Sequence, residues 1–359
     1  MTARTGGDGS AARPSRTPGA GGTAAPSRLV VVGDVTTDVV AVLAAPLAFG
    51  SDTPGAIRTL PGGQGANTAA WLAWLGRRVT LVGAVGDDDA GRDRLRELTA
   101  AGVACAVRRC PGVPTGVVLV LSQARERTMV SQRGANLCLD GDDVADVLTT
   151  ATDAGHLHLS GYPLLDAPSR PGGLRALDEA RRRGLTTSVD AASAHPLRGA
   201  GPERFLTWVT GVDVLLANAD EAAVLTGTAD PGEAVRHLTR IARHAVVKLG
   251  RDGALWGEGG GRLHHADAPR VPVVDSTGAG DAFAAGLLAA WVDGAPPPEA
   301  VRHGCALGSR AVTTVGGRPT PTAPGAWPGD AARAGTGGPR WTGRAGTPVV
   351  ADHAADPPP

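Results

Sequence analysis

Short apolar runs alternate with helix-forming segments along most of this chain, and this alternation constrains the fold more than any other feature. Residues 29–32 read Leu-Val-Val-Val and stop at a glycine, which is typical of a strand buried on both faces. Residues 67–75 then predict a helix, residues 79–85 a second strand and residues 88–101 an amphipathic helix. Similar strands and helices follow at residues 156–160, 173–183, 185–189, 212–217, 220–226 and 245–249. Repeated strand–helix units predict an α/β fold with a mostly parallel sheet covered by helices on both faces.

Two regions interrupt this rhythm and predict a second, smaller sheet. Residues 35–60 and 115–132 lack helical spacing, and the second region predicts a hairpin that turns near residues 123–126. We expect these lid strands within about residues 35–61 and 113–133, projecting from the main domain in the position of a lid. Such a sheet has open edges that invite pairing, so we also expect a homodimer formed through the lid.

Both ends of the chain have a different composition. Residues 1–27 and 319–359 are rich in Gly, Ala, Pro, Ser, Thr and Arg and poor in large apolar side chains. Because such segments cannot bury enough surface to offset their ordering entropy, we predict two disordered tails around one domain at residues 28–318.

Charge and cysteine content exclude several classes of partner. Lys and Arg total 35 and Asp and Glu total 35, which gives no reason to expect a nucleic acid or an anionic membrane as partner. No apolar run reaches the roughly 20 residues of a membrane span, and the amino end lacks an apolar signal segment. The four cysteines show no metal-binding spacing and predict reduced thiols in a cytoplasmic protein: Cys105, Cys110, Cys138 and Cys305.

The segment Val-Val-Asp-Ser-Thr-Gly-Ala-Gly-Asp at residues 273–281 leads into an apolar helix. Gly278, Ala279 and Gly280 leave backbone N–H groups uncovered at the positive end of that helix, which favours an anion. Asp281 lies in the first turn and can accept a proton, a pairing that suits phosphoryl transfer to a hydroxyl. The alternative is a plain helix start with Asp281 as a cap. The pattern G-x-x-x-x-G-K-[ST] is absent from the sequence, and the glycine spacing here does not match G-x-G-x-x-G.

Other polar residues follow predicted strands or open predicted helices. Gly62 and Gly63 allow close approach of a ligand, and Asn67 can both donate and accept hydrogen bonds. Asp38 follows the first strand, at the sheet edge where ligands bind in open α/β folds. Each of these positions is also compatible with an ordinary loop or cap.

Two further strand ends point to the same edge. Asn218 and Glu221 have the spacing of a helix capping box, and they also offer oxygen ligands for a hydrated Mg²⁺. Lys248 is the only lysine in a chain that otherwise uses arginine, and it stands at a strand end before Gly250 and Gly253. A flexible ammonium is a usual partner of phosphate, whereas the alternative is a surface charge.

Taken in order, these motifs resemble the ribokinase (PfkB) family of carbohydrate kinases over about residues 28–318. The motifs are Gly-Gly-x-Gly-Ala-Asn at 62–67, Arg-Gly-Ala-Asn at 133–136, Asn-x-x-Glu at 218–221, Lys-x-Gly-x-x-Gly at 248–253 and Asp-Ser-Thr-Gly-Ala-Gly-Asp at 275–281. The resemblance implies a ribokinase-like three-layer α/β sandwich with a β-sheet lid, and an enzyme that transfers the γ-phosphoryl group of ATP, with Mg²⁺, to a sugar or nucleoside hydroxyl.

The resemblance also implies residue roles. Asp281 would be the base, and Gly278, Ala279 and Gly280 its anion hole. Asn218 and Glu221 would hold the hydrated metal, and Asn218 also lies beside the nucleotide. Asp38, Gly62, Gly63 and Asn67 would contact the acceptor, whereas Lys248, Gly250 and Gly253 would face ATP. Some relatives bind a monovalent cation such as K⁺ beside the anion hole, and Asp275 and Thr277 stand at the matching positions.

Two departures affect the choice of acceptor. Thr36 replaces an asparagine of ribokinase, and Leu-Ser-Gly-Tyr at 159–162 lacks a glutamate that ribokinase has there. These departures argue against ribose as the acceptor, although a hydroxyl-rich acceptor is still expected. A nucleoside kinase and a catalytically inactive sugar-binding regulator are the alternatives. The low aromatic content of 3% disfavours the first, and the retained Asp281 disfavours the second.

Overall fold

A computed structural model describes residues 27–123 and 126–319 of the chain. Apart from Ser27 and Pro319, the two predicted tails lie outside these residues, as does the tip of the predicted hairpin at 124–125.

The predicted parallel sheet is present, and it forms the centre of the domain. Nine strands of the described residues pair in the order β13-β12-β11-β10-β9-β8-β1-β4-β5. The seven strands from β11 to β5 are parallel, and β12 and β13 add to one edge in antiparallel fashion. The strands are β1 (Arg28–Val32), β4 (Val79–Gly86), β5 (Ala104–Cys110), β8 (Ala154–Ser160), β9 (Thr186–Asp190), β10 (Val214–Asn218), β11 (His244–Lys248), β12 (Ala254–Glu258) and β13 (Leu263–Ala266).

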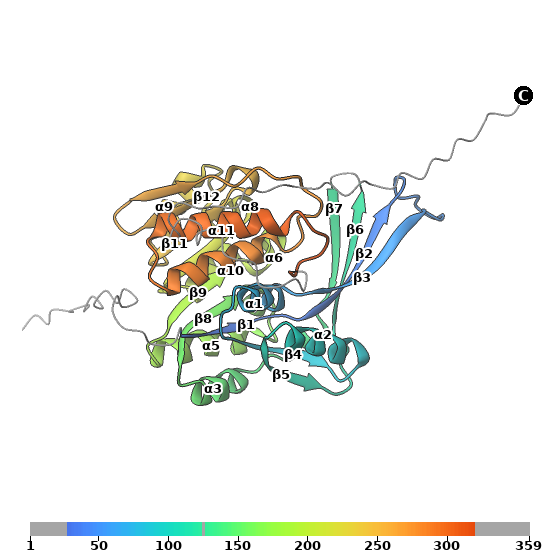
Figure 1. The fold of residues 1–359 in the computed structure, drawn as a ribbon, viewed down its shortest axis with the longest axis horizontal. Helices are drawn as coiled ribbons and strands as arrows, with labels where there is room; N and C mark the ends of the chain where they lie inside the picture. The colour runs from blue at the N-terminus through green and yellow to red at the C-terminus, as the bar shows by residue number, and fades with distance from the viewer. Residues whose placement is uncertain (1–26, 124–125, 320–359) are drawn as a thin grey trace, which may run out of the picture. The chain divides into compact units, whose positions relative to one another are not determined.

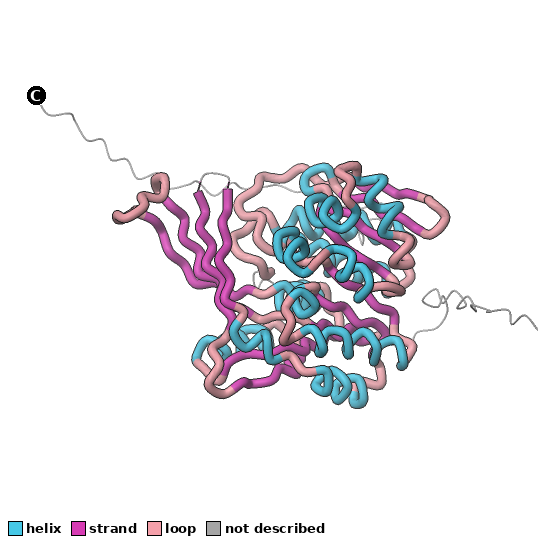
Figure 2. The backbone as a smooth tube through the Cα atoms, turned by 180° about the vertical axis from the view of Figure 1, so that it is seen from behind, coloured by secondary structure: helices cyan, strands magenta, loops and turns pink. Residues whose placement is uncertain are grey.

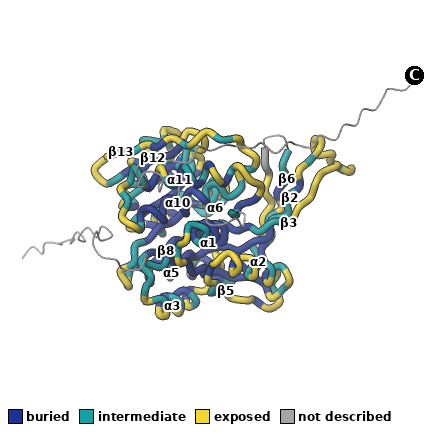
Figure 3. The backbone as a smooth tube through the Cα atoms, in the orientation of Figure 1, coloured by how far each residue is buried: buried dark blue, intermediate teal, exposed yellow. Residues whose placement is uncertain are grey.

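Helices cover both faces of this sheet, as predicted, and each face has its own hydrophobic core (Figures 1 and 3). One face packs against α1 (Gln64–Trp74), α2 (Asp89–Ala100), α10 (Ala279–Val292) and α11 (Pro297–Ala311). The other packs against α3 (Gly141–Thr150), α4 (Tyr162–Leu165), α5 (Arg170–Arg182), α6 (Ala194–Ala200), α7 (Pro202–Trp208), α8 (Ala219–Thr226) and α9 (Pro231–Leu238). Single 3₁₀ turns occur at η1 (Gly134–Cys138) and η2 (Gly250–Asp252). Among the described helices, none combines the length and apolar character of a membrane span.

A separate four-stranded sheet stands beside the helix-covered body (Figure 2). Its order is β3-β2-β6-β7, made of β3 (Gly55–Gly62), β2 (Thr36–Leu43), β6 (Gly116–Gln123) and β7 (Glu126–Gln132). Both regions that lack helical spacing thus contribute strands to one sheet. We call this sheet the lid sheet.

The strands that the sequence pattern missed are mainly at edges. β5 and β13 are the two edge strands of the central sheet, where each pairs on one side only and more side chains meet water, and β12 lies next to β13. Such strands lose the continuous apolar run that identifies a buried strand. Arg108 and Arg109 in β5 illustrate this, since both are exposed although they belong to a strand.

Candidate active site

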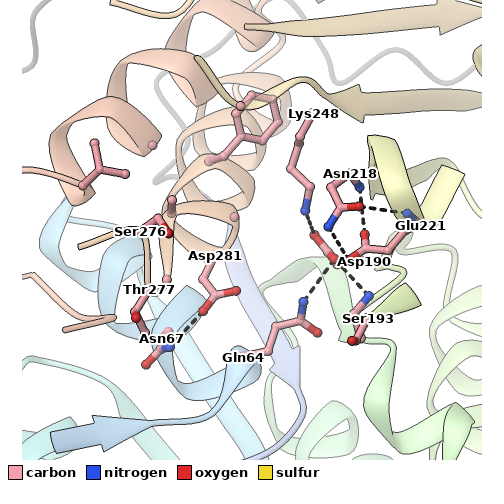
Figure 4. Close-up of a pocket in the computed structure, with 18 of the residues that line it drawn as sticks. Gln64, Asn67, Asp190, Ser193, Asn218, Glu221, Lys248, Ser276, Thr277 and Asp281 are labelled. Atoms are coloured by element: carbon pink, nitrogen blue, oxygen red, sulfur yellow. Dashed lines mark hydrogen bonds and ion pairs between the residues drawn. The ribbon is translucent and has the colours of Figure 1, made fainter. Parts of the chain in front are cut away.

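A cavity of about 1070 Å³ opens at the carboxyl ends of the central strands, between the amino end of α10 and the lid sheet. Many of the residues singled out in the sequence line it, from both ends of the chain (Figure 4). Those residues are Asp38, Gly63, Asn67, Asn218, Glu221, Lys248, Gly250, Gly253, Thr277, Gly278, Ala279, Gly280 and Asp281. Gly62 and Asp275 do not line the cavity themselves but directly precede the lining residues Gly63 and Ser276.

Asp281 lies in the first turn of α10 and lines the cavity. Asn67, at the start of α1, donates a 2.8 Å hydrogen bond from Nδ2 to Asp281 Oδ2. Burial raises the pKa of Asp281 to about 7, and the hydrogen bond from Asn67 opposes that rise. A carboxylate with a pKa close to the working pH is well suited to accept and release a proton. Within the described residues, no side chain caps the start of α10, so the simple capping role for Asp281 finds no support.

The turn before Asp281 is built from positions where a side chain does not fit. Gly278 has a φ of 72°, in the left-handed region, and a Cβ there would lie 2.4 Å from Gly317 Cα. A Cβ at Gly280 would lie 3.4 Å from Lys248 Nζ, which places the ammonium beside the turn. The amino end of α10 and the charge of Lys248 therefore meet at this turn, an arrangement that favours an anion. The N–H of Ala279 donates a 3.3 Å hydrogen bond to the Ser276 carbonyl.

Lys248 is not a surface charge. It forms a buried ion pair with Asp190, with 2.6 Å between Nζ and Oδ2. Burial lowers the pKa of Lys248, but the carboxylates of Asp190 and Glu221 outweigh this effect, so the pKa is raised and the lysine stays charged. The other carboxylate oxygen of Asp190 accepts a 3.0 Å hydrogen bond from Gln64 Nε2.

Asp190 and Gln64 are site residues that the sequence reasoning missed. Asp190 ends β9 next to the strand that ends at Asn218, so its position after a predicted strand was an available signal. The strand was predicted at residues 185–189, but no recognised motif included the aspartate that ends it.

Asn218 and Glu221 form a complete capping box at α8. Glu221 N donates to Asn218 Oδ1 at 2.8 Å, and the Glu221 carboxylate accepts from Asn218 N and Nδ2, both at 2.7 Å. Glu221 is nevertheless buried on the cavity wall, and burial raises its pKa to about 7. The helix capping box that the sequence predicted for Asn218 and Glu221 is thus present. The same carboxylate lies on the cavity wall, where its oxygens can serve as metal ligands.

The opposite end of the cavity carries Asp38. Thr36 Oγ1 donates to Asp38 Oδ1 at 2.8 Å, while burial raises the pKa of Asp38. A Cβ at Gly62 would lie 2.1 Å from Asp38 Oδ1, so glycine is required to admit this carboxylate. Gly63 has a φ of 97°, and a Cβ there would lie 2.4 Å from the Asp34 carbonyl oxygen, so this position also requires glycine.

Arg133 and Tyr162 also line this end and were not predicted as ligand contacts. The guanidinium of Arg133 lies 4.5 Å from the Tyr162 ring centre and bonds Asp166 Oδ2 through Nε at 2.8 Å. Asn136, from the same motif, serves the backbone: its Oδ1 accepts from Val35 N at 2.9 Å and its Nδ2 donates to Val35 O at 3.0 Å.

The four remaining predicted residues are held by backbone geometry or by local hydrogen bonds. Gly250 and Gly253 have φ values of 59° and 90°, and a Cβ at Gly253 would collide with the Ala266 carbonyl. Asp275 Oδ1 accepts from Thr277 N at 2.9 Å and from Thr277 Oγ1 at 2.8 Å, while its Oδ2 accepts from Gly316 N at 3.0 Å. This carboxylate thereby ties the segment after α11 to the turn before α10.

Comparison with known proteins agrees with this geometry. The model of the pfkB family carbohydrate kinases matches residues 26–323. The chain is 33% identical over 262 residues to a 2-dehydro-3-deoxygluconokinase of Thermoproteus tenax, covering 69% of this chain and 80% of that protein.

Solved structures extend the likeness to the fold. An adenosine kinase from Sinorhizobium meliloti superimposes with a TM-score of 0.75 and 25% identity, covering 86% of this chain and 99% of that one. The aminoimidazole riboside kinase from Salmonella enterica, solved with aminoimidazole riboside and an ATP analog, gives 0.66 and 26%, covering 83% and 96%.

The fold and the site together define a phosphotransferase that acts on a hydroxyl of a small molecule. The chain belongs to the pfkB family of carbohydrate kinases, and the resemblance to ribokinase and the ribokinase-like fold are both confirmed. The chain is an ATP-dependent sugar kinase of this family.

Proposed function

We propose that Asp281 is the catalytic base of this kinase and that its acceptor is a hydroxyl-rich sugar. The observation that carries the proposal is the position of Asp281, in the first turn of α10, where the positive end of the helix and Lys248 meet. Asp38, Gly62, Gly63 and Asn67 surround the acceptor, whereas Asn218, Lys248, Gly250 and Gly253 face ATP.

In the proposed reaction, the acceptor hydroxyl gives its proton to Asp281 while its oxygen bonds to the γ-phosphorus. The bond from that phosphorus to the bridging oxygen breaks, and ADP leaves with the electron pair. Because the transition state is loose, most of the catalysis comes from positioning and charge stabilisation. The amides of Gly278, Ala279 and Gly280 and the ammonium of Lys248 supply that charge stabilisation.

Mg²⁺ is part of the proposal. The cavity wall offers hard oxygen donors at Glu221 and Asn218, which suit a hydrated Mg²⁺ that keeps most of its waters. A bound cation would favour the ionised form of Glu221, whose pKa burial has raised to about 7. The cation would neutralise phosphate charge. A K⁺ beside Asp275 and Thr277 remains a prediction.

The acceptor end favours a sugar over a nucleoside. Tyr162 is the aromatic residue among the cavity-lining side chains there, and the guanidinium of Arg133 already stacks on its ring. The nucleobase of a nucleoside would need a free aromatic face to gain stacking energy. A nucleoside kinase of the same family is therefore the second candidate, and the family membership and the retained Asp281 argue against an inactive sugar-binding regulator.

The lid sheet supports the proposed homodimer. Residues paired across neighbouring strands share a face, so Asp38, Val118 and Ser131 lie on the cavity face. Leu119 and Val130 lie on the opposite face and are 37% and 58% exposed. An exposed apolar face beside open edges invites a second copy. Light scattering should give a dimer, and a monomer at working concentration would contradict the proposed homodimer.

A cytoplasmic location also remains a prediction.

A screen for ADP release tests the proposed function. The full-length protein with ATP and Mg²⁺ is offered pentoses, hexoses, sugar acids, sugar phosphates and nucleosides, with Asp281→Asn as the matched blank. We expect Asp281-dependent ADP release with one of the sugars or sugar derivatives. Preferred turnover of a nucleoside would select the alternative, and acceptor-stimulated turnover that survives in Asp281→Asn would remove the proposed base.

A further inference from the structure

The segment that follows α11 returns to the catalytic centre. Gly316 N bonds Asp275, and the Gly317 carbonyl accepts a 3.0 Å hydrogen bond from Trp71 Nε1 of α1. Gly317 also lies against Gly278, and a Cβ on Gly317 would lie 2.6 Å from Asn67 Nδ2. The segment is therefore packed between the turn before α10 and the start of α1, which places the next residue beside Asn67.

That residue, Arg318, has a side chain only 9% exposed. Its Nε donates to Asn67 Oδ1 at 3.2 Å and its Nη2 donates to the Gly62 carbonyl at 2.9 Å. Nη1 lies 3.8 Å from Glu97 Oε2. Burial lowers the pKa of Arg318 to about 10, so the guanidinium remains charged at neutral pH.

These contacts settle which way the Asn67 amide points. An amide group presents an oxygen on one side and an NH₂ on the other, and it can rotate to exchange them. A guanidinium has only donors, so Arg318 attracts the oxygen. The NH₂ group is then held toward Asp281, where it donates to Oδ2 at 2.8 Å. With the amide reversed, its oxygen would face the carboxylate and repel the ionised form.

We propose that Arg318 is a positioning residue for the reaction, acting on Asp281 through the orientation of Asn67. The inference rests on the proposed role of Asp281 as base. Arg318 also holds the Gly62 carbonyl, next to the glycine that admits Asp38, so one side chain fixes both the base and part of the acceptor loop.

The test is the pH profile of kcat for Arg318→Met, which removes the donors and keeps the length. A hydrogen bond to the charged form of a carboxylate lowers its pKa, so loss of the Asn67 donor should raise it. We expect the acid limb to move to higher pH, kcat at pH 7 to fall at least about 10-fold, and much of the loss to recover in alkaline buffer. Arg318→Lys keeps a donor and should leave the acid limb in place.

Two controls separate positioning from structure. Arg170→Met removes a half-buried arginine that also bonds backbone carbonyls, those of Leu164 and Leu165, away from the cavity. It should lower the melting temperature without moving the acid limb. Asn67→Leu should move the acid limb as Arg318→Met does, and the double variant should move it no further, because both changes break one chain of contacts.

The outcomes are distinct. An unmoved acid limb in Arg318→Met, or additive effects in the double variant, would overturn the inference while leaving Asp281 as the base. If Arg318→Met does not fold, a shifted acid limb in Arg318→Lys or an unshifted one in Asn67→Leu would overturn it. An acid limb that persists unchanged in Asp281→Asn would instead overturn the proposed function.

Discussion

Lys248 and Asp190 form an ion pair across β10, the strand that separates theirs, with 2.6 Å between Nζ and Oδ2. Through its other oxygen Asp190 also accepts from Gln64, which lies in the loop–helix junction that leads to Asn67. The proposed phosphate partner and the acceptor side of the cavity are thereby joined through one buried carboxylate.

Replacement of this lysine should separate its two roles. Lys248→Met should raise the KM for ATP or lower kcat, with little change in the KM for the acceptor. The free energy of unfolding should fall by about 3–5 kcal/mol, because Asp190 is left as an unpaired buried charge. Steady-state kinetics and urea denaturation measure the two effects, and Asp190→Asn reports the loss of the pair with the lysine retained. A stability loss with unchanged ATP kinetics would make Lys248 purely structural.

Glu221→Gln tests the proposed metal site. The half-saturating Mg²⁺ concentration should rise, because glutamine is a neutral and weaker ligand. Glutamine keeps one acceptor oxygen, so one of the two bonds from Asn218 is lost, at a cost of about 1 kcal/mol of stability. Glu233→Gln is the control, since Glu233 accepts from Thr228 near the start of α9 and lies away from the cavity. An equal Mg²⁺ requirement in both variants would contradict the assignment.

Stability should depend on pH in a definite direction. The pKa of Asp281 rises from 3.8 to about 7 on folding, so the folded chain holds a proton that the unfolded chain releases. Its contribution to stability is complete below about pH 4 and is lost as pH rises through 7. As the pH is raised from 5 to 8, the free energy of unfolding should therefore fall less in Asp281→Asn than in the wild type, as measured by urea denaturation. An identical pH dependence in both proteins would show that Asp281 ionises freely.

The sequence was a good guide wherever chemistry and position coincide in one local motif. The glycine turn at 278–280, the helix that carries Asp281 and the two faces of the central sheet follow from glycine placement, apolar runs and helix periodicity. Asp190 was missed although its strand was predicted, because its contact with Lys248 depends on the order of the strands in the sheet. Arg318 carries no local signal at all, since it stands among glycines and prolines at the predicted domain boundary.

Two truncations bear on that boundary. A chain that lacks residues 1–26 and ends at Pro319 should fold and keep its kinase activity, because the composition of the removed segments supports no core. A chain shortened further, to end at Gly317, loses Arg318, and its turnover should fall at least about 10-fold. Light scattering and ADP release give the readouts. Loss of folded protein in the longer of these two truncated chains would show that a removed segment contributes to the domain.

The central claim is that Asp281 takes the proton of the acceptor hydroxyl, and its most direct test is the turnover of Asp281→Asn. Asparagine keeps the size of the side chain and can still meet Asn67, but it has no basic oxygen. We predict a melting temperature close to that of the wild type, retained binding of ATP and sugar by calorimetry, and a kcat at least about 10²-fold lower. A folded variant that keeps its turnover would contradict the account and return Asp281 to a structural role.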